Sequence, residues 1–273
     1  MDIAALLNLV ESDERYHGLV EQLRARADGA ARGAASPPLS AGVLEAARPY
    51  LIAALRREWP APILVVSGTP EDARQLAEQI DAWSGAGRRC LYLPPPDTLF
   101  YDRTVWDRDT VQARVNVLGA LTALGGERGD AGGAGLVIST SMWALMTLTA
   151  PPMGLRRAQR RIAVGQILPM QELLAWCVRT GYEPVTVVEE PGTFSRRGSI
   201  VDIYPPNLSQ PLRIDSFGDE IDTLRVYDPA TQRSVHDLEQ ALLLPASEAL
   251  PEWGRAAAKA LAALDLTSCD QAT

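Results

Sequence analysis

Lysine, cysteine and histidine are all scarce in this chain of 273 residues, and each scarcity excludes a class of protein. The three cysteines, Cys90, Cys177 and Cys269, are odd in number and far apart, which argues against a disulfide framework and fits a reducing cytoplasm. The two histidines form no cluster with the cysteines at the spacing of metal ligands. We therefore expect a cytoplasmic protein with no bound metal.

Long apolar runs are also missing. No stretch approaches the roughly 18 uncharged apolar residues of a membrane span, and the amino terminus lacks the basic start of a signal peptide, so we expect no membrane partner. The formal charge of -8 disfavours a wholly basic surface for nucleic acid, although it leaves room for a local basic patch. The apolar fraction of 47% and charged fraction of 22% are those of a soluble globular protein.

The first half of the chain alternates between helical and strand patterns. A helix over 2–27, broken near Ser12, precedes a small-residue linker over 28–41. Further helices are predicted at 42–58, 70–84, 110–124 and 141–147, and strands at 63–66, 90–93 and 136–139. Thr69 followed by Pro70 is a typical helix start. Strands that alternate with helices indicate a parallel sheet with helices on it.

After Pro151 the pattern becomes rich in strands. A strand at 161–164 and a helix at 168–180, ended by Gly181, precede strands predicted at 184–189, 194–204, 211–217, 221–227 and 235–244. We therefore predict an α/β domain with an inserted α+β domain. The expected limits are 1–41 for the amino-terminal helix and linker, 42–150 for the α/β domain, 151–243 for the α+β domain, and 244–273 for a truncated return to the α/β domain.

The α/β half lacks the residues of a nucleotide site. A phosphate loop of the form GxxxxGK[ST] needs a lysine for the terminal phosphates. The corresponding turn here runs from Ser67 to Asp72, contains two acids, and lies far from Lys259, the only lysine of the chain. We therefore predict no nucleotide hydrolysis by this chain, no catalytic residues and no cofactor.

Two other polar groups have ordinary structural explanations. Ser139, Thr140 and Ser141 lack a surrounding GxSxG motif and are best explained as helix caps. The acids Asp97, Asp102, Asp107 and Asp109 are better explained as solvated loop carboxylates than as a metal or acid–base site. The nearby aromatics Phe100, Tyr101 and Trp106 more often fix a loop to the core than stack on bases.

The strand at 211–217 separates its side chains onto two faces. Leu212, Ile214 and Ser216 suit the core. The opposite set is Arg213, Asp215 and Phe217. An arginine beside an exposed aromatic is typical of a protein-binding hot spot. Periodicity leaves an alternative open, in which Phe217 packs under the following turn and Arg213 pairs with Asp215.

A resemblance favours the first interpretation. The segments EPGTFSRRGSIVDIYPP, PLRIDSFGDEIDTLRVYDPATQRS and LLLPA resemble the amino-terminal, UvrB-homologous module of the bacterial transcription-repair coupling factor (Mfd) family. The upstream segment LPPPDTLFYDR, followed by RVNVLGAL, is similar to the same family but less specific. The resemblance covers about residues 60–250.

The resemblance implies a degenerate helicase-like α/β domain that carries an inserted UvrA-binding domain. It implies a non-catalytic module that recruits UvrA, and with it nucleotide excision repair, to stalled RNA polymerase. In the full-length family, an ATP-dependent translocase, ATP and Mg belong to motor domains that this chain lacks, and RNA polymerase and double-stranded DNA bind other absent domains. The implied UvrA contacts are Arg197, Arg213 and Phe217, with Arg196 and Asp215 as weaker candidates.

The orientation of Arg197 and the role of an arginine-rich segment stay open. Simple alternation places Arg197 on the side of Val201 and Ile203, which look core-facing. A bulge at Gly198 would reverse this, and so would burial of the opposite set. Arg196 is the competing candidate. The alternative function is a DNA-binding module whose phosphate contacts would come from an arginine-rich face. That face comprises Arg156, Arg157, Arg160 and Arg161, together with Arg196 and Arg197.

Overall fold

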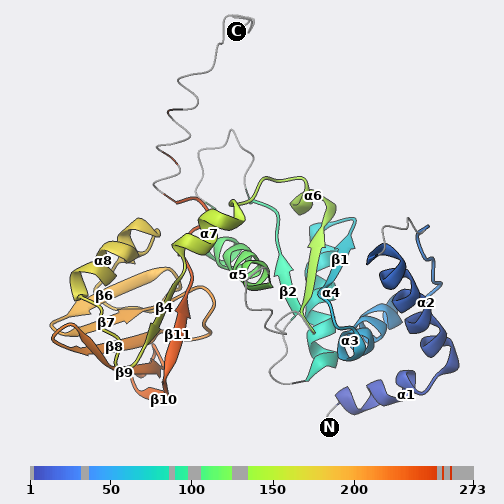
Figure 1. The fold of residues 1–273 in the computed structure, drawn as a ribbon, viewed down its shortest axis with the longest axis horizontal. Coiled ribbons are helices and arrows are strands. Elements are labelled where there is room, and N and C mark those ends of the chain that lie inside the picture. Colours follow the sequence, from blue (N-terminus) through green and yellow to red (C-terminus); the bar gives the residue numbers. More distant parts are fainter. Residues whose placement is uncertain are drawn as a thin grey trace, which may run out of the picture. The chain divides into compact units, whose positions relative to one another are not determined.

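The computed structural model describes residues 3–31, 37–85, 90–97, 106–124, 135–250, 254 and 259. Its contacts divide the chain into two compact units (Figure 1). The first comprises residues 1–96 and 123–147, and the second comprises residues 97–122 and 148–273. Among the described residues, no helix is both long enough and apolar enough to span a membrane.

The first unit is built on a parallel sheet, as predicted. Strands β1 (Ile63–Ser67), β3 (Val137–Ser141) and β2 (Cys90–Leu93) lie in the order β1-β3-β2, and both pairings are parallel. Helix α4 (Pro70–Ser84) packs on this sheet through Ala77 and Ile80, which are buried with Cys90 and Val137. Thr69 caps the helix as expected, because its Oγ1 accepts the N–H of Asp72 at 3.1 Å.

Several helices precede this sheet in the chain. The bounds are Ile3–Leu6 for η1, Leu7–Glu11 for α1, Glu14–Ala31 for α2, Glu45–Ala47 for η2 and Arg48–Glu58 for α3. The predicted break near Ser12 is confirmed, since Ser12 ends α1 and the Asp13 carboxylate accepts the N–H of Arg15 at 2.7 Å as α2 begins. Leu7, Tyr16 and Ala54 are buried in a cluster of their own beside α3.

The three hydroxyl residues at the end of β3 are all fully buried, and only one of them is a cap. Ser141 Oγ accepts the N–H of Ala144 at 3.2 Å and so caps α6 (Met142–Leu145), as predicted. Ser139 Oγ instead donates to the carbonyl of Ala73 at 2.7 Å, and Thr140 Oγ1 donates to that of Leu93 at 3.0 Å. For Ser139 and Thr140 the capping prediction was wrong, because Ser139 links β3 to helix α4 and Thr140 links β3 to the neighbouring strand β2.

The second unit is an α+β fold, also as predicted. Its sheet has the order β10-β9-β8-β7-β6-β5, with all pairs antiparallel except β5 and β6. The strand bounds are Glu183–Pro184 (β5), Thr193–Arg197 (β6), Ile200–Ile203 (β7), Leu212–Phe217 (β8), Glu220–Tyr227 (β9) and Ser234–Leu238 (β10). A separate pair joins β4 (Arg160–Ala163) to β11 (Gln240–Leu243), and the helices are α5 (Arg108–Leu124), α7 (Pro152–Ala158) and α8 (Met170–Arg179).

Helix α8 covers one face of the six-stranded sheet (Figure 1). Its buried residues Leu173, Trp176 and Cys177 pack in one cluster with side chains of β6 to β9, such as Ile203 and Leu224. Gly181 follows the helix with φ +88°, which supports the predicted helix end. The sheet therefore has a core face under α8 and an opposite face, which we call the outer face.

Three strand predictions in this unit were wrong in their limits. The predicted strand 194–204 is a hairpin, since β6 and β7 pair with each other across Gly198 and Ser199. The strand predicted at 184–189 is only two residues long. Beyond it, the Thr186 carbonyl accepts hydrogen bonds from side chains of β6 rather than from the backbone of a neighbouring strand. The strand predicted at 235–244 is split between two sheets, and the carbonyl of Glu239 at the break accepts the N–H of Val164 at 3.0 Å.

A buried ion pair joins distant segments of the second unit. Arg114 of α5 donates to both carboxylate oxygens of Glu248, at 2.6 and 3.0 Å, and their side chains are 0% and 8% exposed. The N–H of Ala150 donates to the same carboxylate at 3.2 Å. Most of α5 belongs to the second unit. The domain limits predicted at 41, 150 and 243 stay predictions.

Candidate protein-interaction surface

The outer face is defined by the register of the hairpins. Val201, Ile214 and Leu224 lie side by side under α8 and are buried. Residues one position along each strand must face the other way. Arg197 pairs with Ile200, which pairs with Asp215, and Asp202 pairs with Arg213. The outer face therefore carries Arg197, Ile200, Asp202, Arg213, Asp215 and Phe217.

The register settles the orientation of the two neighbouring arginines. Because the chain turns at Gly198 and Ser199, Arg197 lies opposite Ile200 on the outer face, and Arg196 lies opposite Val201 in the core-side row. Both side chains are exposed at the end of the sheet. Arg197 Nη2 donates to the Thr186 carbonyl at 3.1 Å, and Arg196 Nε donates to the Gly198 carbonyl at 3.2 Å. Arg197 thus shares a face with Arg213, although a turn and not a bulge reverses the alternation.

Arg213 is held by a partner that the sequence did not reveal. Its Nε and Nη2 donate to the two carboxylate oxygens of Asp202 at 2.7 and 2.8 Å, and Asp202 is almost fully buried. Its Cζ lies 4.5 Å from the ring centroid of Tyr227, and Nη2 also donates to Gln232 at 3.2 Å. These hydrogen bonds to Asp202 raise the pKa of Arg213.

The alternative in which Arg213 pairs with Asp215 is wrong. Asp215 is two residues along the same strand, whereas Asp202 is directly opposite Arg213 on β7 and is the nearer acid. Asp215 Oδ1 instead accepts a hydrogen bond from Ser199 Oγ at 3.3 Å. Only the cross-strand register, which local spacing does not contain, would have identified Asp202.

Phe217 is 86% exposed. It ends β8 immediately before the turn at Gly218, whose φ is +64°, and its partner across the turn is Glu220. The alternative in which Phe217 packs beneath the turn is therefore wrong. An exposed phenylalanine on a hydrogen-bonded hairpin offers apolar area that is already ordered, as binding anchors commonly do.

Several arginines at positions 156–161 of the arginine-rich face have polar partners within the molecule. Arg156 Nε donates to the Thr122 carbonyl at 3.2 Å, and Arg160 forms an ion pair with Glu172. Arg161 reaches Gln240 at 3.5 Å, and Arg157 is exposed. Three of these four arginines thus have a polar partner within the molecule, which reduces the support for the DNA-binding alternative.

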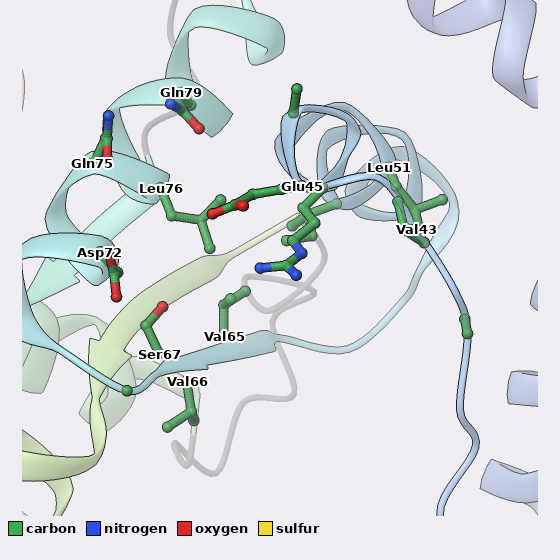
Figure 2. A pocket seen from close by; sticks show the side chains of 15 residues that line it. Val43, Glu45, Leu51, Val65, Val66, Ser67, Asp72, Gln75, Leu76 and Gln79 are labelled. Atoms are coloured by element: carbon green, nitrogen blue, oxygen red, sulfur yellow. The ribbon is translucent and has the colours of Figure 1, made fainter.

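The turn that would hold a phosphate loop opens on a pocket of about 880 Å³ in the first unit (Figure 2). Asp72, Gln75 and Gln79 line it from α4, and Glu45 lines it from η2. Arg48, the first residue of α3, also lines it. The N–H of Asp72, which would otherwise be free for an anion at the helix start, is already bonded to Thr69. Among the described residues, two carboxylates, from Glu45 and Asp72, line this pocket against the single guanidinium of Arg48, and the lining includes no lysine for terminal phosphates.

The loop acids before α5 act as caps. The Asp97 carboxylate accepts the N–H of Asp107 and the hydroxyl of Thr110, both at 2.7 Å, and Asp107 accepts the N–H of Asp109 at 3.1 Å. Among the described residues there is no group of three or more acids, histidines or cysteines that could hold a metal ion. The predictions for Phe100, Tyr101 and Asp102 lie outside the described residues.

Comparison with known proteins places this surface in a named domain. Residues 161–248, which include the whole outer face, match the family model of the UvrB interaction domain. The chain is 36% identical over 215 residues to the transcription-repair-coupling factor of Myxococcus xanthus, covering 77% of this chain and 17% of that protein. It is 30% identical over 242 residues to the transcription-repair-coupling factor of Mycobacterium tuberculosis, covering 87% of this chain and 18% of that protein.

A shorter match connects the chain to a second kind of protein. It is 33% identical over 87 residues to the UvrABC system protein B of Thermosipho africanus, which covers 32% of this chain and 13% of that protein. In each of these comparisons the chain spans less than a fifth of the length of its relative.

Proposed function

We propose, from the premise that this chain is a relative of the bacterial transcription-repair-coupling factors and carries a UvrB interaction domain, that it is a recruitment module which binds UvrA. In this role it brings nucleotide excision repair to stalled RNA polymerase, while polymerase and double-stranded DNA are bound by parts outside this chain. The observation that carries the proposal is the 86% exposure of Phe217 on the outer face.

The surroundings of Phe217 support this use. Arg197 is exposed on the same face. It pairs with Ile200, Ile200 pairs with Asp215 on the next strand, and Asp215 precedes Phe217 by two residues. A charged group beside an apolar anchor is the usual composition of a hot spot. We assign the central contacts to Phe217 and Arg197, with Arg213, Arg196 and Asp215 as further contacts.

The module itself performs no chemistry in this proposal. The pocket between η2 and α4 is lined by Glu45, Asp72 and Arg48, and its described lining does not include the lysine that a nucleotide site would need. We therefore expect ATP and Mg to bind only to motor domains outside this chain.

Binding to purified UvrA tests the proposal. Phe217→Ala should weaken binding by about 2 kcal/mol or more, which is about 30-fold in Kd. The matched control is Val178→Ala, since Val178 is 59% exposed on α8, on the other side of the sheet. Both variants should keep the wild-type melting temperature. If the wild-type chain does not bind UvrA, or both variants bind equally well, the proposal fails.

Arg197 provides a second test and Arg213 does not. Arg197→Ala removes an exposed side chain with one hydrogen bond to a carbonyl, so the fold should be unaffected. It should weaken UvrA binding more than Arg179→Ala, which removes an exposed arginine of α8. Arg213→Ala would instead leave the buried carboxylate of Asp202 unpaired, and a loss of binding could then report a damaged fold.

A further inference from the structure

Three neighbouring segments at one end of the sheet present their side chains in the same alternation. Phe217 pairs with Glu220 across the β8–β9 turn, and Glu220 pairs on its other side with Ile167 in an antiparallel bridge. Cross-strand partners lie on one face. The residues next to them, Ser216, Ile221 and Leu168, are buried. Phe217, Glu220 and Ile167 therefore form one row on the outer face, which we call the anchor row.

The anchor row has an apolar group at each end and a carboxylate in the middle. Phe217 is 86% exposed and Ile167 is 68% exposed. Glu220 is exposed and has no ion-pair partner in the described part of the chain. With Cβ atoms about 5 Å apart across each pair, the two apolar side chains are about 10 Å apart. An isolated surface isoleucine needs no explanation, but this one continues the surface of Phe217.

The backbone that carries Ile167 is fixed on both sides. The N–H of Leu168 donates to the Asp219 carbonyl at 2.6 Å, and the N–H of Ile221 donates to the Gln166 carbonyl at 2.9 Å. The N–H of Gly165 donates to the Ile221 carbonyl at 2.8 Å. Leu168 itself is buried in the core under α8. Ile167 is thus already ordered, so its burial by a partner costs little conformational entropy.

Exposed side chains of opposite charge lie apart from each other at this end of the sheet. The β6–β7 and β8–β9 turns lie at the same end, because Ile200, next to the first turn, pairs with Asp215, close to the second. Arg196 and Arg197 are exposed at the first turn, and Glu220 and Asp222 are exposed at the start of β9. Three strand spacings, about 14 Å in all, separate β6 from β9. A partner with acidic groups opposite the arginines and a cation opposite Glu220 would fit in one orientation only.

We infer that Ile167 is a second apolar anchor of the proposed UvrA-binding surface, and that Glu220 receives an arginine or lysine of the partner between the two anchors. This inference rests on the proposed function, and it extends the surface from the β8–β9 turn to the 164–168 segment. The partner face that fits the anchor row is apolar at two points with a cation between them.

The experiment measures binding of purified UvrA to the wild-type chain and to single variants. Ile167→Ala should raise Kd by about 5- to 30-fold, whereas Val178→Ala, which truncates a similar exposed side chain on α8, should leave it unchanged. Glu220→Gln should lower the association rate at low salt, and this difference from wild type should vanish in 1 M NaCl because an ion pair is screened there. The melting temperatures of all variants should match wild type.

The outcomes separate the inference from the proposed function. If Phe217→Ala weakens binding but Ile167→Ala and Glu220→Gln bind like wild type, the inference is overturned and the proposed function stands. If Ile167→Ala changes the melting temperature, Ile167→Thr, which keeps the branched shape, should fold normally and still bind more weakly. Normal binding by that variant overturns the anchor role. If the wild-type chain does not bind UvrA, both the inference and the proposed function are wrong.

Discussion

At the scale of single residues, Arg213 contributes to the fold as well as to the candidate surface. Its guanidinium makes two hydrogen bonds to Asp202 and lies over the ring of Tyr227. Removing one partner of a buried ion pair leaves the other charge without compensation. Arg213 is 23% exposed, however, so solvent reduces the penalty. Replacing Arg213 is therefore expected to lower the stability of the second unit as well as to change the candidate surface.

Arg213→Ala should lower the free energy of unfolding of the second unit by about 2 kcal/mol, because the carboxylate of Asp202 is left buried and unpaired. Hydrogen exchange of peptides from residues 193–227, followed in increasing urea, measures this locally. The double variant Asp202→Ala, Arg213→Ala should lose less than the sum of the two single variants, by about 1 kcal/mol. Additive losses would show that the pair contributes nothing.

The same residues show where sequence reasoning succeeded and where it could not. Alternation along β8 correctly placed Leu212 and Ile214 in the core and Phe217 outside, because that information is local. The partner of Arg213 depends on which residue of β7 lies opposite, and that register is set across the 204–211 connection between β7 and β8. Ile167 was missed for the same reason, since nothing in AVGQILP indicates a bridge to Glu220.

At the scale of elements, the β6–β7 hairpin determines which arginine faces outward. The sequence SRRGSIV reads as one continuous strand if Gly198 is taken as a bulge, and as two strands if Gly198 and Ser199 form the turn. Gly198 has φ +64°, and a Cβ there would meet no heavy atom within 4 Å. The requirement for glycine is therefore conformational rather than steric.

Gly198→Ala should lower the free energy of unfolding by about 1 kcal/mol, since an L residue pays that cost in the left-handed region. Gly198→Asn should lose less, because asparagine tolerates this conformation. Thermal unfolding of the two variants beside wild type measures the difference. Equal losses for alanine and asparagine would point to a cause other than the backbone angle, and a loss-free alanine would show that the turn relaxes.

At the scale of the whole chain, the two units differ in how far their strands could be predicted and in which candidate site they carry. The α/β rhythm of the first half was readable from the order of its patterns, and the parallel sheet follows from it. The split of the last predicted strand between two sheets was not, because SVHDLEQALLL contains no glycine or proline that would mark a break, while its two halves pair with different partners. The outer face belongs to the second unit, and the pocket beside β1 belongs to the first.

That pocket gives a prediction for the intact chain, namely that Mg-ATP does not stabilise it. Ligand binding raises the free energy of unfolding by RT ln(1 + [L]/Kd), so 5 mM nucleotide with a Kd above about 10 mM adds less than about 0.3 kcal/mol. Weak binding is expected because Glu45 and Asp72 line the pocket against Arg48, the single cation among its described lining residues, and the Asp72 N–H at the start of α4 already donates to Thr69.

Thermal unfolding with and without Mg-ATP, with magnesium chloride alone as the control, should therefore give the same transition for the first unit. Gly68→Asp is the matched variant, since a side chain at Gly68 meets no heavy atom within 4 Å and the fold should tolerate it. A saturable rise in melting temperature that Gly68→Asp abolishes would contradict the prediction, and it would show that the first unit retains a nucleotide site despite its acids.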